Sequence, residues 1–172
     1  EIQTGMGRTG TLFAYEQAGV SPDIMTLAKA LANGLPMGAM LAREAVAAAF
    51  GPGAHASTFG GTPIVSAAAL ETCRVMEADG VLGHCRRVSD HFRSRLGWLK
   101  GRHAVIEEVR GRGLLLGIRL GTDGERIVLK CMERGFLINC VQGKILRFVP
   151  PLVIREEEID ALIACLDEVL AS

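Results

Sequence analysis

The chain has 172 residues, of which 49% are hydrophobic, so it is long enough to bury a core and has the size of one domain or two small ones. Lysine plus arginine equals aspartate plus glutamate, at 19 each, and this balance excludes a global attraction to nucleic acid or to an anionic membrane. No apolar run reaches the roughly 18 residues of a membrane span. Five scattered cysteines without a CxxC pair fit reduced thiols in a cytoplasmic protein, not a disulfide framework or a metal site.

The first motif along the chain is GMGRTG, residues 5–10, which has the G-x-G-x-x-G spacing of dinucleotide-binding folds. That fingerprint needs a strand before it, a helix that opens on it and an acidic residue about 20 positions later. Only EIQT precedes the motif, and Glu16 and Asp23 come too early to be that acidic residue. We therefore favour the alternative, a glycine-rich turn whose residues adopt positive φ angles and pack closely.

Short apolar segments alternate with turns between residues 11 and 62. Lys29 stands inside the apolar run IMTLAKAL, between a Ser-Pro-Asp turn and an Asn-Gly-Leu-Pro break. The elements expected here are a helix in LFAYEQAG, a short buried strand in MGAMLA, a helix in REAVAAAF and a long loop in GPGAHASTFGGTP.

Two longer helices are predicted next. Pro63 suits the first turn of a helix and Thr62 its N-cap, and apolar residues at helical spacing continue to about residue 80. The second helix, about residues 81–99, has an apolar face and an opposite face that is basic. The basic residues are Arg86, Arg87, Arg93, Arg95 and Lys100. A solvated face is favoured over a nucleic-acid contact, because no aromatic platform accompanies these charges.

From about residue 104 the chain reads as a small α+β unit without long glycine-rich loops. Its expected strands are VIEEVRG, LLLGIRL, FLINCV and KILRFV, and its expected helices are ERIVLKCMERG and EEEIDALIACLDEVLA. The three glutamates that open the last helix lie where the helix dipole favours negative charge. The expected fold class is α/β, with a boundary between residues 80 and 100.

Lys29 is the most informative single residue, because a charged lysine is costly to bury. One interpretation is a lysine at a strand end whose stem packs on apolar surface while its amine reaches water. The other is a lysine whose pKa is lowered by its pocket, so that it can form a Schiff base. The glycine-rich loops would then approach a phosphate, with Ser57 and Thr58 as hydroxyl donors, although these hydroxyls equally fit ordinary turn residues.

Five segments carry a family resemblance in chain order: EIQTGMGRTG, DIMTLAKALANGLPMGAMLA, STFGGTP, RGRGLLLGI and LRFVPPLVI. Together they resemble the class III aminotransferases, which use pyridoxal 5′-phosphate. The resemblance covers the C-terminal part of such an enzyme and implies the fold type I architecture. Residues 1–80 would be the end of the large cofactor-binding domain, and residues 81–172 the small C-terminal α+β domain. It also accounts for the glycines of residues 5–10, which belong to a longer family motif beside the cofactor.

The resemblance implies roles for four cofactor-binding residues. Lys29 matches the catalytic Schiff-base lysine. Glu1 belongs to the motif that contains Gln3, and Gln3 matches the glutamine that hydrogen-bonds the phenolic oxygen of the cofactor. Thr58 matches the threonine that binds the cofactor phosphate of the partner subunit. The aspartate that pairs with the pyridine nitrogen, and the upstream phosphate loop, would precede residue 1.

For the substrate, the resemblance implies two contacts. Ser57 matches a position that contacts substrate, and Arg147 matches an arginine that can pair with a substrate carboxylate. One departure is Thr62, where the family often has asparagine; Thr62 can still cap a helix, so little change is expected.

The implied function is a ping-pong transamination by a cytoplasmic homodimer with a shared active site. The amino group would pass from N-acetylornithine or ornithine to 2-oxoglutarate, as in arginine biosynthesis, without a metal, nucleic acid or membrane. Succinylornithine, GABA or a diamine remain alternative donors, and a non-catalytic fragment or dimerising module of the same fold is a further alternative. The 172 residues alone are expected to bind cofactor weakly and to be inactive.

Overall fold

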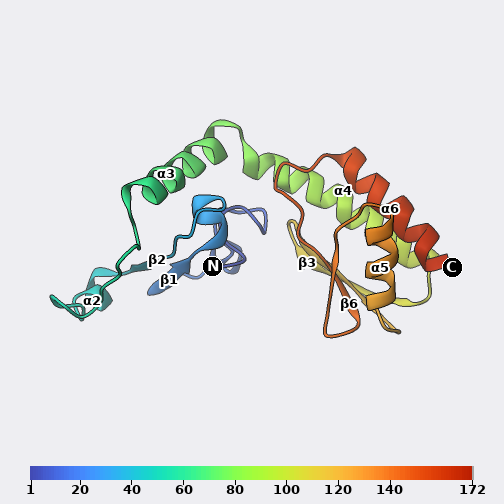
Figure 1. The fold of residues 1–172 in the computed structure, drawn as a ribbon, viewed down its shortest axis with the longest axis horizontal. Helices are drawn as coiled ribbons and strands as arrows, with labels where there is room; N and C mark the ends of the chain where they lie inside the picture. Colours follow the sequence, from blue (N-terminus) through green and yellow to red (C-terminus); the bar gives the residue numbers. More distant parts are fainter. Residues whose placement is uncertain (172) are drawn as a thin grey trace. The chain divides into compact units, whose positions relative to one another are not determined.

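The structure is a computed structural model that describes residues 1–171, and it divides the chain into two compact units. The first unit is Glu1–Leu82, and the second runs from Gly83 to the C-terminal end (Figure 1). Among the described residues, no helix has both the length and the apolar character needed to cross a bilayer.

The first unit is built around a two-stranded antiparallel hairpin. Strand β1 pairs with β2 so that Ile24 lies opposite Ala42 and Leu27 opposite Ala39. The unit's elements are α1 (Tyr15–Ala18), β1 (Ile24–Leu27), the 3₁₀ helix η1 (Lys29–Ala32), β2 (Ala39–Ala42), α2 (Glu44–Ala47) and α3 (Pro63–Ala78).

The strand expected in MGAMLA is present as β2, but the expectation that it is buried is wrong for this chain. Met40 and Leu41 are each about half exposed, at 49% and 48%. The reason is that β2 has a single hydrogen-bonded neighbour, β1, and two strands cannot cover their own faces.

Helix α3 begins at Pro63, as the sequence predicts, because proline lacks an N–H that the first turn would leave unpaired. Thr62 takes the N-cap position with an extended backbone. The expected side-chain cap is absent, however, since the Thr62 hydroxyl makes no hydrogen bond to the first turn. The start of α3 therefore depends on Pro63 more than on Thr62.

The second unit is a four-stranded antiparallel sheet with three helices. The strand order is β3-β4-β6-β5, so the last strand in the chain lies inside the sheet and β5 lies at its edge. The elements are α4 (Val81–Arg102), β3 (Ile106–Arg112), β4 (Leu115–Leu120), α5 (Glu125–Glu133), β5 (Asn139–Val141), β6 (Ile145–Phe148) and α6 (Glu156–Ala171).

One hydrophobic cluster holds the second unit together, and its buried side chains come from the helices and the sheet, between Cys85 and Val169. Leu116, Ile118 and Leu120 alternate along β4 and all enter this cluster, as expected for a strand with one buried face. Side chains at the intervening positions, including Arg119 on β4 and Arg147 on β6, lie on the opposite face. That opposite face is where polar groups of the sheet remain available.

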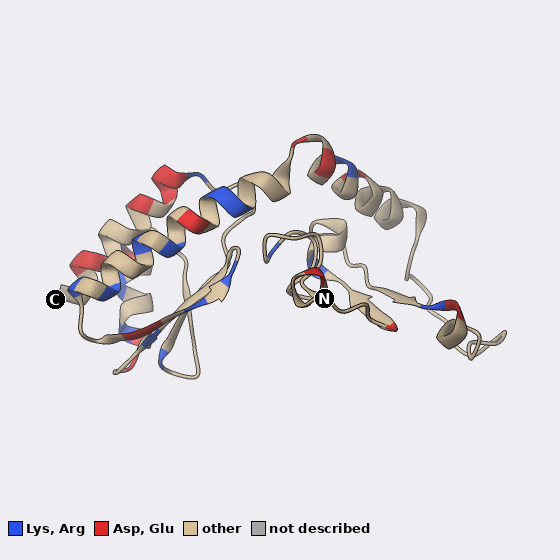
Figure 2. Cartoon of the chain, turned by 180° about the vertical axis from the view of Figure 1, so that it is seen from behind, with Lys and Arg blue, Asp and Glu red and all other residues tan. Residues whose placement is uncertain are grey.

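The basic face of α4 is largely exposed, as the sequence predicts, and Arg87 and Arg95 of this face, together with Arg102, also pair with acidic residues of α6 (Figure 2). The N-terminal parts of the two helices pair with each other, as do their C-terminal parts, so the helices run parallel. The pairs are Arg87–Glu156 at 3.6 Å, Arg95–Asp160 at 2.8 Å and Arg102–Asp167 at 3.0 Å. These charges are used within the fold, which disfavours the nucleic-acid interpretation further.

Candidate functional site

The glycine-rich segment at residues 5–10 folds as a self-contained turn. The amide of Gly5 donates to the carbonyl of Glu1 at 3.0 Å, and the amide of Gly10 donates to the carbonyl of Gly7 at 3.0 Å. Gly7 and Gly10 have φ angles of 85° and 97°, which glycine adopts without strain. No strand precedes the segment within the described residues, and α1 has only four residues. The turn that the sequence predicts is therefore present, and the four-residue helix α1 is much shorter than the helix that opens on a dinucleotide-binding fingerprint.

Glu1 ties the two ends of this loop together. Its carboxylate accepts a hydrogen bond from the amide of Tyr15 at 3.0 Å and another from the hydroxyl of Thr4. The largest single effect on the pKa of the Glu1 carboxyl is burial, which raises the pKa because it favours the neutral form. The bonds from Thr4 and from the backbone of Ala14 and Tyr15 together outweigh burial and hold its pKa below the ordinary value. The ionised carboxylate of Glu1 therefore braces the loop.

Gln3 lies between Glu1 and Thr4 on the same loop, but its side chain is exposed. Its amide makes no hydrogen bond to any other described residue. The loop therefore presents one free amide next to a braced carboxylate.

Lys29 begins η1, directly after the residue that follows strand β1. Its φ angle is 48°, in the left-handed region that non-glycine residues rarely enter. Leu31 and Ala32, which follow in η1, are buried, whereas the side chain of Lys29 is exposed. It forms no ion pair or hydrogen bond with the rest of residues 1–171. A strained backbone at a free amine is a pattern found at functional sites, where the surrounding structure holds the strain.

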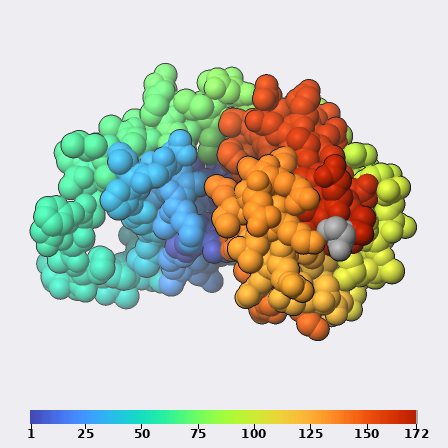
Figure 3. All heavy atoms as spheres, turned by 45° about the vertical axis from the view of Figure 1, so that its right-hand side comes forward, coloured from blue at the N-terminus to red at the C-terminus, as the bar shows by residue number. Residues whose placement is uncertain are grey.

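Ser57 and Thr58 lie in the loop that joins α2 to α3, which stands out from the rest of the first unit (Figures 1 and 3). The Ser57 hydroxyl accepts a hydrogen bond from the amide of Gly60 at 2.8 Å, so it shapes the turn. Thr58 is exposed, and its hydroxyl has no partner among the residues the structure describes. The two neighbouring hydroxyls are thus distinct, because one is engaged and the other is free.

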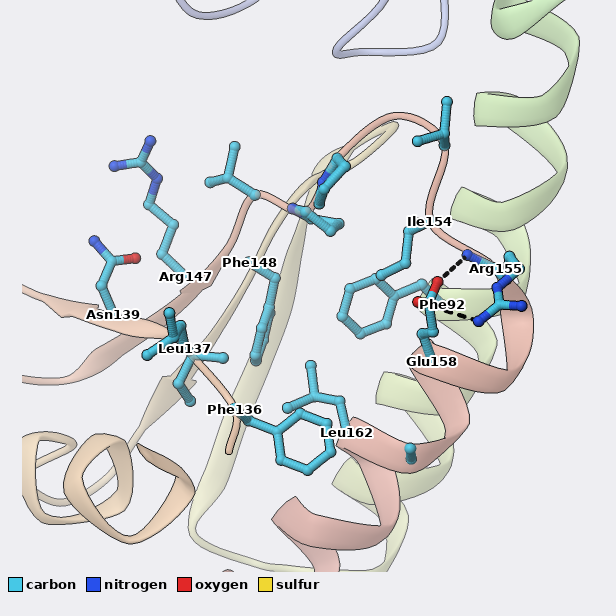
Figure 4. Close-up of a pocket in the computed structure, with 16 residues that line it drawn as sticks. Phe92, Phe136, Leu137, Asn139, Arg147, Phe148, Ile154, Arg155, Glu158 and Leu162 are labelled. Carbon is cyan, nitrogen blue, oxygen red and sulfur yellow. Dashed lines mark hydrogen bonds and ion pairs between the residues drawn. The ribbon is translucent and has the colours of Figure 1, made fainter. Parts of the chain in front are cut away.

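A groove of about 900 Å³ runs along the second unit, between the β5–β6 hairpin and α4 and α6 (Figure 4). Its floor is apolar and includes Phe92, Phe148 and Leu162. Two polar groups lie at different places on its rim. One is the pair Arg155 and Glu158, whose side chains are 3.4 Å apart; the other is Arg147, next to Asn139.

Arg147 is half-buried on β6, between Gly117 of β4 and Asn139 of β5. Within residues 83–171, Arg147 and the exposed Arg126 are the arginines for which no ion pair or hydrogen bond is found. A partly buried guanidinium without a carboxylate partner is costly unless a ligand supplies one. Its five fixed donors match a carboxylate in two-point geometry.

The residues of the first unit fit pyridoxal 5′-phosphate by their chemistry. Lys29 has a free amine that could react with an aldehyde, Gln3 a free amide that could bind a phenolic oxygen and Thr58 a free hydroxyl that could bind a phosphate. No group of three or more metal-ligating side chains occurs in the described part of the chain. The available donors suit an organic phosphate-bearing cofactor.

Asn139 lies beside Arg147 but is not among the site residues predicted from the sequence. The sequence shows a turn at Gln142-Gly143 but not its length, and the length sets the register of the strands on either side. Val141 pairs with Ile145 across a three-residue turn, so positions equally far from Gly143 face each other, which brings Asn139 opposite Arg147. The family resemblance points to Arg147 and does not point to Asn139.

Comparison with known proteins identifies the family that the chain resembles. The model of the class III aminotransferases matches residues 1–170. The chain is 49% identical to the acetylornithine aminotransferase of Caldanaerobacter subterraneus and 48% identical to that of Aquifex aeolicus. It aligns over 99% of its own length in both cases, but over only 44% and 43% of theirs. The chain thus spans less than half the length of these relatives.

Solved structures of aminotransferases are also similar to this chain. The ornithine aminotransferase of Toxoplasma gondii superposes with a TM-score of 0.93 at 36% identity, over 99% of this chain and 41% of its own. The acetylornithine aminotransferase of Elizabethkingia anophelis superposes with a TM-score of 0.92 at 33% identity, over 99% and 44%. The Toxoplasma structure has partial occupancy of pyridoxal phosphate at its active site.

The resemblance and the expected fold class are both confirmed: the mixed α/β chain corresponds to the C-terminal part of the fold type I pyridoxal-phosphate transferases. The family model covers nearly every residue, and the relatives are close to half identical to the chain. Both findings identify the same family. This chain belongs to the class III aminotransferases.

Proposed function

We propose that the chain is the C-terminal part of a pyridoxal-phosphate-dependent enzyme that transfers an amino group from N-acetylornithine or ornithine to 2-oxoglutarate, as in arginine biosynthesis. The observation that carries this proposal is Lys29, a free amine on a strained backbone at the position of the family's Schiff-base lysine. Relatives at 44–49% identity that are named acetylornithine aminotransferase support the choice of donor.

In this proposal Lys29 does the proton chemistry. Its Nζ would hold the cofactor between turnovers. Once released from it, the Nζ would take a proton from the donor carbon that bears the amino group. When bound, the cofactor supplies an electron sink for the electron pair left on that carbon.

The remaining residues bind and orient. Gln3 would donate its amide to the phenolic oxygen of the cofactor, and Glu1 would keep the loop around Gln3 in place through Thr4 and Tyr15. Arg147 would bind a substrate carboxylate, for which its guanidinium is free.

We further propose a cytoplasmic homodimer with a shared active site. Thr58 lies on a loop that stands out from the first unit, and its hydroxyl would reach the cofactor phosphate of the partner subunit, with Ser57 near the substrate. All five cysteines are free thiols, which supports a reducing compartment.

Reductive trapping tests the assignment of Lys29. Borohydride treatment of the full-length holoenzyme, followed by peptide mapping, is expected to place the cofactor label on Lys29, and Lys29→Ala should abolish turnover while leaving the protein folded. A label on Lys100, Lys130 or Lys144 would contradict the proposal. Turnover with N-acetylornithine, ornithine, succinylornithine and GABA, measured side by side, decides among the donors.

A further inference from the structure

We propose that Asn139 and Arg147 form a two-residue clamp for a substrate carboxylate, in which Asn139 fixes the position that the charge of Arg147 attracts. The inference rests on the proposed function, since it requires that Arg147 bind a carboxylate. What is new is the role of Asn139, which lies directly opposite Arg147 in the β5–β6 ladder.

The geometry follows from the pairing. Opposite residues of an antiparallel pair project to the same face of the sheet, with their Cβ atoms roughly 4.5–5.5 Å apart. Figure 4 shows the side chains of Asn139 and Arg147 extending together from the hairpin, away from the apolar floor around Phe92 and Phe148. That spacing lets an amide and a guanidinium donate to the same planar group.

Both side chains are free to do so. The Asn139 amide is exposed and makes no hydrogen bond to another described residue, and the guanidinium of Arg147 likewise has no partner there. The acid that lines the groove, Glu158, accepts from the amide of Arg155 at 2.9 Å and pairs with its guanidinium. Arg147 forms no ion pair with a carboxylate of residues 1–171.

The other flank of Arg147 has a residue without a side chain. Gly117 lies opposite it on β4, and a Cβ at that position would come within 3.2 Å of the Leu146 carbonyl oxygen. A larger residue is thus disfavoured beside Arg147 on that side, and of the two residues directly opposite Arg147 in the ladders only Asn139 has a side chain. The charged Arg147 therefore lies on the inner strand β6, and the neutral donor Asn139 lies beside it on the edge strand β5.

The chemistry of the two donors identifies the ligand class. A guanidinium binds both oxygens of a carboxylate, and an amide N–H can add a third, directional bond to one of them. A neutral amide adds this bond without a second positive charge, so it favours a carboxylate over a dianionic phosphate. The clamp is therefore suited to the carboxylate of an amino acid or of a 2-oxo acid.

Glutarate is a suitable probe, because it has two carboxylates and lacks the oxo group needed for turnover. In the full-length holoenzyme, Asn139→Ala is expected to weaken glutarate binding, measured by calorimetry, by roughly 10- to 100-fold, the effect of one hydrogen bond to a charged group. It should raise KM for 2-oxoglutarate by a similar factor while kcat changes less than about twofold. Asn139→Asp should weaken binding further, because its carboxylate would pair with Arg147.

Two variants control for indirect effects. Asn139→Gln keeps the amide and should restore part of the affinity, which a purely structural role of Asn139 would not predict. Lys144→Ala removes an exposed polar side chain from the same hairpin and should leave glutarate binding unchanged.

The outcomes separate the two proposals. Glutarate affinity that falls in Arg147→Ala and stays at the wild-type value in Asn139→Ala would overturn the clamp and leave the proposed function standing. Affinity unchanged in Arg147→Ala would overturn both the clamp and the proposed carboxylate site, whereas the labelling of Lys29 would still test the rest. Equal losses in Asn139→Ala and Asn139→Gln would also count against the clamp.

Discussion

Two buried thiols show how strongly the core of the second unit controls individual groups. Cys131 on α5 is fully buried, and Cys165 on α6 lies beside it. Burial, together with the nearby Cys165, raises the pKa of the Cys131 thiol to about 12. The Cys131 thiol is buried away from solvent, whereas Cys73 is exposed.

The raised pKa of Cys131 predicts a loss of stability in alkali. The unfolded thiol ionises near 9.0, whereas the folded thiol keeps its proton up to about 12. The unfolded state therefore binds fewer protons in this window, and the contribution of this thiol to the free energy of unfolding, constant below pH 9, should fall as the pH rises toward 12. Urea titrations between pH 8 and pH 11 should show a steeper fall for the wild type than for Cys131→Ala. Equal slopes would contradict the assignment.

At the level of elements, the β3–β4 hairpin depends on one glycine. Gly111 has a φ angle of 119°, and a Cβ there would lie 2.1 Å from the carbonyl oxygen of Leu115. Gly111→Ala combines backbone strain with a clash, so we expect it to lower the free energy of unfolding by about 2 kcal/mol or more.

The matched control for this substitution is Gly97→Ala, at an exposed position of α4 where a Cβ meets nothing. It should raise stability by about 0.5–1 kcal/mol, because alanine favours the helix. Chemical denaturation followed by circular dichroism measures both variants. A similar loss in the two would show that the hairpin tolerates a Cβ.

The ion pairs between α4 and α6 end at Asp167. Its carboxylate accepts from Arg102 Nε at 3.0 Å and from His103 Nε2 at 2.6 Å. The hydrogen bond from Arg102, followed by that from His103, holds the pKa of Asp167 below its ordinary value of 3.8. This contribution to stability is present above pH 3.8 and is lost as the pH falls through the lower folded pKa.

Asp167→Asn should therefore lower the free energy of unfolding at pH 7, and the difference from the wild type should shrink as the carboxylate is protonated in acid. Trp98, whose ring lies 4.8 Å from the guanidinium of Arg102, reports the transition by fluorescence. Asp90→Asn, an exposed position of α4, is the control and should behave as the wild type at every pH. A difference that persists undiminished at low pH would count against the ion pair.

These elements also show what the sequence could and could not predict. Helix α6 and the β5–β6 hairpin were predictable, because their apolar spacing and turn residues are local signals. The pairing of Arg102 with Asp167 was not, since the two are 65 positions apart and only the tertiary fold brings them together. In the site, Lys29 could be found from its motif, whereas its left-handed backbone and the free neighbour of Arg147 required the structure.

For the molecule as a whole, the two units differ in how they are stabilised. The continuous hydrophobic cluster lies in the second unit, between Cys85 and Val169. The first unit has a few buried apolar side chains, such as Leu27 and Leu31, and long exposed loops. The assignment of these parts to a large and a small domain of a complete enzyme stays a prediction.

At this scale, the proposed dimer makes a prediction about Thr58. One hydrogen bond from a hydroxyl to a charged phosphate contributes about 1.5–3 kcal/mol. Thr58→Ala in the full-length enzyme should therefore weaken cofactor binding roughly 10- to 100-fold, without affecting the chemistry of Lys29 at saturating cofactor.

A mixed dimer of one Thr58→Ala subunit and one Lys29→Ala subunit shows which subunit supplies the hydroxyl. Its lysine-bearing site lies on the Thr58→Ala chain and would receive threonine from the other chain, so its cofactor affinity should be near that of the wild type. If the affinity matches that of the Thr58→Ala homodimer, Thr58 acts within its own subunit.

The short turn of the β5–β6 hairpin has a consequence for how such a chain can change over time. Val141 pairs with Ile145, so three residues join the strands, and Gln142 and Gly143 both have positive φ angles. Inserting or deleting one residue there would shift the register and move Asn139 to the other face of the sheet without altering its identity. The pairing of Asn139 with Arg147 thus depends on their separation of eight positions as well as on the identity of the two residues. A single-codon insertion or deletion in the turn could remove the pairing while both residues persist.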